Sequence, residues 1–82
     1  MPAHNGHVLQ GVLSSRELEV LAMTSAGCTN SETAERLGVT VHAVKFHLGS
    51  VYRKLGVANR TEAAVAYLRS GSGAAAQIGE ET

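Results

Sequence analysis

The side chains best suited to bind a polyanion lie on one arc of the helix predicted from residue 41 to residue 55. At about 100° per residue, six residues share this arc: His42, Lys45, Phe46, Gly49, Ser50 and Arg53. Cationic side chains contact phosphates and base edges, and an exposed aromatic ring contacts a thymine methyl group or a sugar. No Asp or Glu occurs between Val41 and Thr61. The pattern therefore predicts a surface for nucleic acid.

Phe46 is the most informative of these residues, because it points away from the apolar side of the same helix. An isolated exposed aromatic ring is common, so Phe46 carries weight only together with the cations around it. Lys45, in the second turn, could reach a guanine or a phosphate if the helix enters a major groove N-terminus first. His47 either bonds a phosphate or packs between helices, and both readings stay open. Three basic residues further along suit phosphate contacts better: Arg53, Lys54 and Arg60.

Capping residues and glycines predict the helices that position this arc. A capping residue followed three positions later by glutamate, which satisfies free N–H groups at a helix start, occurs three times: Ser14 with Glu17, Thr29 with Glu32, and Asn59 with Glu62. Thr40 caps the helix 41–55 without such an acid, because Ala43 takes its place. Apolar residues at spacings of three and four mark the core face of that helix: Val41, Val44, Leu48, Val51 and Leu55.

Four helices and no convincing strand follow from this reading. The sequence predicts an all-α fold, a compact four-helix bundle that contains a helix-turn-helix with a tight turn at residues 38–40. Residues 1–12 are predicted to be a flexible lead-in, residues 13–71 the domain, and residues 72–82 a flexible C-terminal tail.

Size and composition narrow the function classes. The chain has 82 residues, enough for one small domain, and its seven basic and seven acidic residues balance. The charges are unevenly distributed, because four of the seven acids precede residue 41, whereas residues 41–61 contain four cations and no acid. The single cysteine, Cys28, cannot form an internal disulfide, and no segment is long enough to span a bilayer. We therefore expect a cytoplasmic protein with no membrane partner.

Other function classes have less support. His42 and His47 are five residues apart and diverge on a helix, so no metal site is predicted. No phosphate-binding loop or nucleophile motif occurs, so we predict no enzyme, no cofactor and no small-molecule ligand. A more serious alternative is a protein-interaction module of the same fold that docks on RNA polymerase, a sigma factor or another regulator with weak DNA contact. The balanced charge and Gly49 favour that alternative slightly.

Three blocks of the sequence resemble the LuxR/GerE-type helix-turn-helix domain of bacterial transcription regulators. LSSRELEVL (residues 13–21) resembles L-T-x-R-E-x-E-V-L, and AGCTNSETAERLGV (residues 26–39) resembles A-x-G-x-x-N-x-E-I-A-x-x-L-x-I. VKFHLGSVYRKLGVANRTEAA (residues 44–64) resembles V-K-x-H-x-x-x-I-x-x-K-L-x-V-x-x-R-x-x-A. The resemblance covers the 59 residues from Leu13 to Gly71. It is compatible with a NarL-like response-regulator effector domain and with a stand-alone GerE-like protein.

The resemblance implies sequence-specific binding to double-stranded DNA, with the third helix in the major groove and the fourth pairing two copies. Together with the arc, it predicts base contacts from four residues: His42, Lys45, Phe46 and Gly49. Predicted phosphate contacts come from six residues: Asn30, His47, Ser50, Arg53, Lys54 and Arg60. Predicted dimerisation contacts come from three residues: Val65, Leu68 and Arg69. Glu17 is also expected to pair internally with Lys54 or Arg60.

Three positions depart from the family pattern. Gly49 offers no side chain where members often carry a longer polar one, and a helical glycine costs about 1 kcal/mol relative to alanine. Ala43 replaces the usual threonine, and Thr33 replaces the usual isoleucine of the second helix. From Thr33 we expect slightly more polar or looser packing in that helix.

Overall fold

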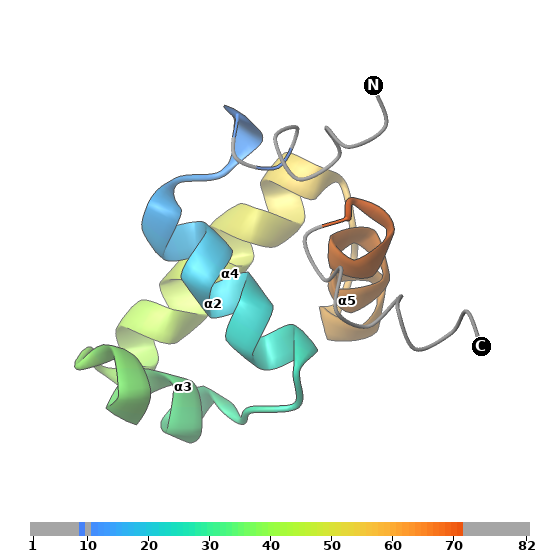
Figure 1. Ribbon diagram of the computed structural model, residues 1–82. Helices are drawn as coiled ribbons and strands as arrows, with labels where there is room; N and C mark the ends of the chain where they lie inside the picture. The colour runs from blue at the N-terminus through green and yellow to red at the C-terminus, as the bar shows by residue number, and fades with distance from the viewer. Residues whose placement is uncertain (1–8, 10, 72–82) are drawn as a thin grey trace.

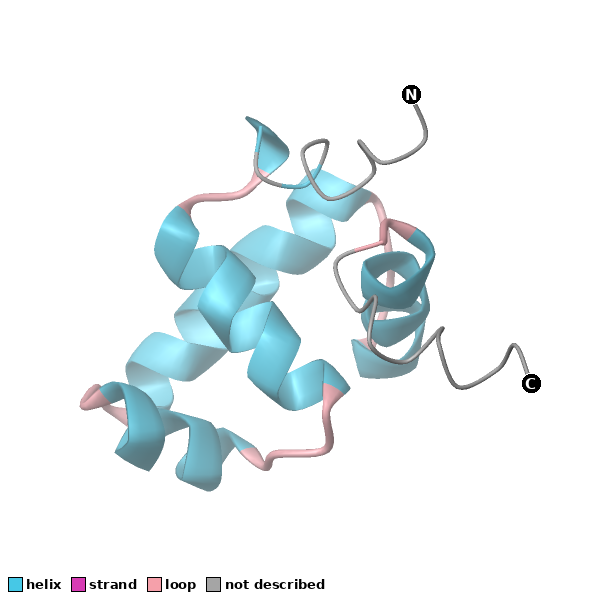
Figure 2. Ribbon diagram, viewed as in Figure 1, coloured by secondary structure: helices cyan, strands magenta, loops and turns pink. Residues whose placement is uncertain are grey.

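The computed structural model describes residue 9 and residues 11–71, and helices are the only regular elements among them (Figure 1; Figure 2). The four labelled helices are α2 (Ser15–Ser25), α3 (Asn30–Leu37), α4 (Val41–Leu55) and α5 (Arg60–Arg69). The predicted all-α fold with a helix-turn-helix is confirmed. None of the helices in this part of the chain combines the length and apolar character needed to cross a bilayer.

The predicted capping boxes begin α2 and α3. Ser14 Oγ accepts a hydrogen bond from the backbone N–H of Glu17 at 3.1 Å, and Glu17 Oε1 accepts one from the N–H of Ser14 at 2.8 Å. Thr29 and Glu32 repeat the arrangement at 3.0 and 2.9 Å. Each box satisfies two backbone donors that have no partner within the helix. The sequence therefore specifies where these two helices start.

The third expected box, at the start of α5, forms differently. Asn59 Oδ1 accepts from the N–H of Glu62 at 2.9 Å, as expected. The carboxylate of Glu62, however, accepts from the N–H of Ala58 at 2.7 Å, one residue before the cap. Asn59 has φ −155° and ψ 177°, a more extended backbone than at the other three caps.

A left-handed glycine makes the tight turn between α3 and α4. Gly38 has φ 70°, a conformation that a side chain disfavours, and the N–H of Val39 then reaches the carbonyl of Ala34 at 3.0 Å. Thr40 follows at once and its Oγ1 accepts from the N–H of Ala43 at 3.0 Å. The turn therefore ends one helix and begins the next within three residues, which fixes the angle at which α4 leaves α3.

The core has two adjoining apolar clusters on either side of α2. One joins α2, α4 and α5 through five buried residues: Leu9, Leu13, Leu21, Val51 and Ala63. The other joins α2, α3 and α4 through four: Val20, Ala34, Val44 and Leu48. Tyr52 packs against both clusters. In Figure 1, α2 crosses α4, with α3 at one end of the molecule and α5 at the other.

Two apolar residues differ from their predicted positions. Val41 was expected in the core stripe, but it is 36% exposed, because it is the first residue of α4 and lies at the end of the interface with α3. Leu9, expected in a flexible lead-in, is buried, and its carbonyl accepts from the N–H of Leu13 at 2.7 Å. The folded core therefore extends upstream of residue 13. Residues 1–8 and residue 10 of the predicted lead-in and the predicted tail 72–82 lie outside the described residues.

Thr33 is packed without an unsatisfied polar group. Its side chain is fully buried, and its Oγ1 donates to the carbonyl of Thr29 at 2.8 Å. A buried hydroxyl is costly only when it lacks a partner. Of the two expectations for Thr33, more polar packing is confirmed by this buried hydroxyl, and looser packing is not seen, since the side chain is fully buried.

Candidate nucleic-acid interface

The exposed face of α4 carries most of the predicted site. Five of the six predicted residues of the arc are exposed: His42, Lys45, Phe46, Gly49 and Arg53. Each of them has another member three or four residues away, so they form a continuous strip along the helix. Phe46 is 68% exposed, more than any other large apolar residue among the described residues. An aromatic ring held this far into solvent has no role in the core.

His47 packs beside Phe46 at the edge of this face. Their ring centroids are 5.7 Å apart and the ring planes meet at 71°, an edge-to-face arrangement that aromatic rings favour. His47 itself is only partly exposed. This contact is with the adjacent residue of the same helix, so both predictions for His47, a phosphate contact or packing between helices, remain predictions.

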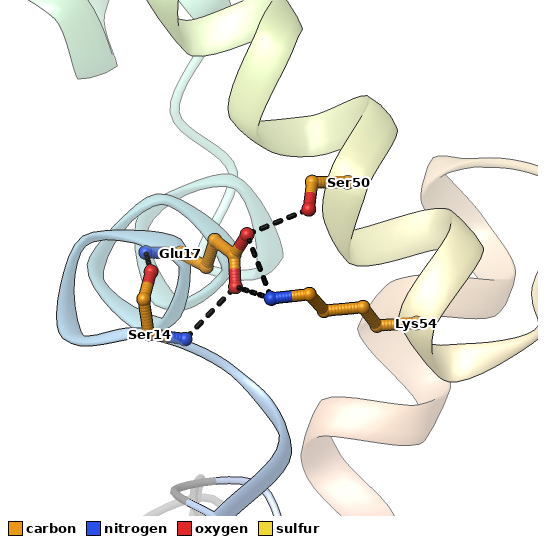
Figure 3. A network of polar contacts seen from close by, with 4 residues as sticks. All are labelled: Ser14, Glu17, Ser50 and Lys54. Carbon is orange, nitrogen blue, oxygen red and sulfur yellow. Dashed lines mark hydrogen bonds and ion pairs between the residues drawn. The ribbon is translucent and has the colours of Figure 1, made fainter.

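Ser50 corrects the predicted arc. It is only 6% exposed, and its Oγ donates to Glu17 Oε2 at 2.6 Å (Figure 3). Ser50 lies about 40° around the helix from Phe46, at the border of the arc. At that border α2 packs against α4 and brings Glu17 to the serine. Its predicted placement on the exposed face is therefore wrong.

The carboxylate of Glu17 accepts hydrogen bonds from three groups, which Figure 3 shows converging on it. Besides Ser50 Oγ and the N–H of Ser14, Lys54 Nζ lies 2.9 Å from Oε1 and 3.2 Å from Oε2. The expected pairing of Glu17 with Lys54 is confirmed. The network joins the start of α2 to the last two turns of α4, and so it fixes the helix that carries the exposed strip.

The protonation of Glu17 reflects this network. Burial raises the pKa of the Glu17 carboxyl, but the hydrogen bonds from Ser50 and the Ser14 N–H, with the bond and charge of Lys54, lower that pKa from 4.5 to about 2. Bonds donated to the ionised form favour that form. Glu17 is therefore a carboxylate at neutral pH, and its charge holds Lys54 in place.

Arg60 and Asn30 bind each other at the junction of α3 and α5. Arg60 Nη2 donates to Asn30 Oδ1 at 2.6 Å, and Arg60 Nη1 donates to the carbonyl of Cys28 at 3.2 Å. A guanidinium group has only donors, so the amide oxygen of Asn30 faces it and the amide NH₂ points elsewhere. The alternative pairing of Arg60 with Glu17 does not occur. This contact links the helix-turn-helix to the start of α5.

Two of the basic residues differ from the others in their bonding. All seven Lys and Arg residues lie in the described part of the chain. Within that part, only two of them lack a hydrogen-bond or ion-pair partner: Lys45 and Arg53. Both are exposed on the α4 strip, eight residues apart. Free charge is therefore concentrated on the face that also exposes Phe46.

The outer face of α5 is apolar where the fourth helix was expected to pair. Val65 is 41% exposed and Leu68 is 46% exposed, and Arg69 is exposed beside them. A shallow hollow on this face is lined by six residues: Val57, Thr61, Glu62, Val65, Ala66 and Arg69. Ala63, on the opposite side of α5, is buried in the core. The helix thus exposes the residues predicted for dimerisation.

Residues 11–67 match the family model GerE, described as bacterial regulatory proteins, luxR family. The chain belongs to the luxR family. The match spans α2, α3, α4 and most of α5, and it includes every residue predicted to contact DNA. This match confirms the resemblance found from the three sequence blocks. The luxR family consists of DNA-binding transcription regulators.

Similar curated proteins are named as transcriptional regulators. The HTH-type transcriptional activator RamA of Corynebacterium glutamicum is 50% identical over 60 residues, which are 73% of this chain and 21% of RamA. The transcriptional regulatory protein LiaR of Bacillus subtilis is 45% identical over 53 residues, 65% of this chain and 25% of LiaR. The transcriptional activator protein EsaR of Pantoea stewartii is 45% identical over 62 residues, 76% of this chain and 25% of EsaR.

This luxR-family chain therefore spans about a quarter of the length of these relatives. No solved structure shows a significant match to it.

The sequence predicted which residues of this luxR-family domain matter better than it predicted which of them contact each other. It did not foresee the contact of Ser50 with Glu17 or that of Arg60 with Asn30, which join residues 33 and 30 positions apart. Helical periodicity carries no signal for such contacts. The one available signal was chemical, since Glu17 is an acid within an otherwise apolar helix face and needs compensation when buried.

Proposed function

We propose that this luxR-family domain binds double-stranded DNA sequence-specifically, with the exposed strip of α4 in the major groove, as part of a bacterial transcription regulator. One observation carries the proposal. The strip exposes Phe46 between Lys45 and Arg53, the two cations without an internal partner among the described residues. A solvent-facing ring and free positive charge on a helix without acids suit a groove lined by phosphates and base edges.

The dimensions of the strip support this docking. Lys45 and Arg53 are eight residues apart, so they lie about 12 Å apart along the helix axis, and the major groove of B-DNA is about 12 Å wide. Phe46 and Gly49 lie between them. A helix that enters with its N-terminal turns first therefore brings Lys45 toward base edges while Arg53 stays near a backbone.

The proposed roles follow the position of each residue on the strip and, for the polar residues, the hydrogen-bond donors left free. Four residues face the bases: His42, Lys45, Phe46 and Gly49. Arg53 and His47 approach phosphates from α4. Asn30, Lys54 and Arg60 keep unused donors beside their internal bonds, since a guanidinium has five N–H groups, an ammonium three and an amide two. These three residues are proposed to bond phosphates at the edge of the interface. Ser50 is left out because its hydroxyl is committed to Glu17.

We further propose that two copies pair through the outer face of α5. The exposed apolar residues Val65 and Leu68 and the shallow hollow beside them support this pairing. Two copies related by a two-fold axis would read half-sites about 10 base pairs apart. The same function assigns the domain to the bacterial cytoplasm, where the chromosome lies, and requires no catalytic group in this chain.

Selection of bound duplexes from a random DNA pool, followed by salt titration, tests the proposed function. We expect a two-fold symmetric consensus and an affinity that falls as salt rises. With a slope of about −0.9 per phosphate neutralised, the three cations proposed to bond phosphates, Arg53, Lys54 and Arg60, give about −2.7 for each copy and about −5.4 for two copies. A pool without a consensus, together with a slope near zero, would favour docking on RNA polymerase or another regulator instead.

A further inference from the structure

Gly49 is a helical glycine that the fold does not explain. It lies in the interior of α4 and does not adopt the left-handed conformation that four other glycines adopt. A Cβ atom added to Gly49 would meet no atom within 4 Å. No neighbouring helix therefore requires the absence of a side chain, and alanine would suit the helix better. The domain carries a residue that weakens α4 without helping its packing.

The surroundings of Gly49 point to a ligand surface. It follows Phe46 by three residues and Lys45 by four, and it precedes Arg53 by four, so all four lie on one face. All four are exposed. The missing side chain leaves a notch in the strip where the α4 backbone itself is accessible. The notch lies between the exposed ring and the two free cations.

We propose that Gly49 is a close-approach residue, where the backbone of α4 comes against base edges and sets how deeply the helix enters the groove. This inference rests on the proposed function. A side chain at position 49 would hold α4 away from the bases and would lengthen the contacts of Phe46 and Lys45. Glycine is used where a backbone must approach a ligand closely. Bases opposite the notch are therefore read by shape and by Phe46, with no hydrogen-bonding side chain from position 49.

The test separates stability from binding with Gly49→Ala and Gly49→Leu. Thermal unfolding should show a melting temperature about 4 °C higher for Gly49→Ala, because the helix is stabilised. Affinity for the duplex selected by the unmodified domain should fall about 10-fold for Gly49→Ala and about 100-fold for Gly49→Leu, the range of a mismatched base pair. A gain in stability with a loss of binding identifies a residue kept for the ligand.

Ser15→Ala and Ser15→Leu are the matched controls, because Ser15 is exposed on α2 away from the strip. Both should bind the duplex within about twofold of the unmodified domain. The inference is overturned if Gly49→Leu binds as tightly as the unmodified domain, or if Gly49→Ala is less stable. In either case DNA binding by the unmodified domain still supports the proposed function. If the unmodified domain binds no duplex, the proposed function itself fails, and the inference with it.

Discussion

Replacing Glu17 by alanine is expected to lower the free energy of unfolding at pH 7 by about 2–3 kcal/mol. The change leaves Ser50 Oγ and the N–H of Ser14 without their acceptor, and it removes the charge that holds Lys54. The expected loss in the free energy of unfolding is smaller than for a fully buried ion pair, because the Lys54 side chain is 41% exposed. Urea unfolding followed by circular dichroism measures the loss. Glu19→Ala is the control, since its exposed pair with Arg16 should contribute well under 1 kcal/mol.

The pH dependence of the same network has a definite sign. The pKa of Glu17 is about 2 in the folded protein and 4.5 at its ordinary value. A lowered pKa contributes stability above pH 4.5 that is lost as the pH falls toward 2. Glu17→Gln keeps the size of the side chain but cannot titrate. The stability difference between the unmodified domain and Glu17→Gln should therefore be largest at pH 7 and shrink from about pH 5 to about pH 2. A difference that stays constant over this range would contradict the assignment.

Lys45→Ala and Arg53→Ala are expected to weaken DNA binding in different ways. Arg53→Ala should weaken binding to all duplexes alike and make the salt slope about 0.9 less steep, because a phosphate contact is lost. Lys45→Ala should weaken binding to the selected duplex by about 10-fold or more and reduce its preference over random duplex, because a base contact is lost. Affinities for both duplexes at several salt concentrations measure the two effects.

Arg16→Ala is the matched control for these variants. Arg16 is a cation on α2, paired with Glu19, and its loss should leave affinity within about twofold. The reverse pattern for Lys45 and Arg53 would exchange their base and phosphate roles. If Lys45→Ala and Arg53→Ala both bind the two duplexes as tightly as the unmodified domain, the α4 strip is not the interface.

Local signals in the sequence predicted the helices well. The cap and the glutamate three positions on specify the starts of α2 and α3, and Gly38 specifies the turn before α4, because these choices depend only on neighbouring residues. Val44, Leu48 and Val51 were predicted to be buried for a similar reason, since a core stripe repeats every three or four residues. The all-α class follows from these elements together.

Contacts between distant segments were harder to predict. Ser50 lies at the border of the polar arc, and only the path of α2 decides that it is buried. Leu9 precedes the first cap among residues without periodicity, so nothing local marked it as part of the core. At the start of α5 the carboxylate of Glu62 accepts from the N–H of Ala58 instead of the N–H of the cap Asn59, a difference that the cap spacing does not predict. Each difference arises from tertiary geometry that one helix's pattern does not contain.

The most direct test of the central claim is to map backbone amide chemical shifts by NMR as the selected duplex is added. If the exposed side of α4 enters the groove, the largest changes will fall on His42, Lys45, Phe46, Gly49 and Arg53, with smaller changes on the outer face of α5. Changes that gather on α5 and leave residues 42–53 unaffected would contradict it.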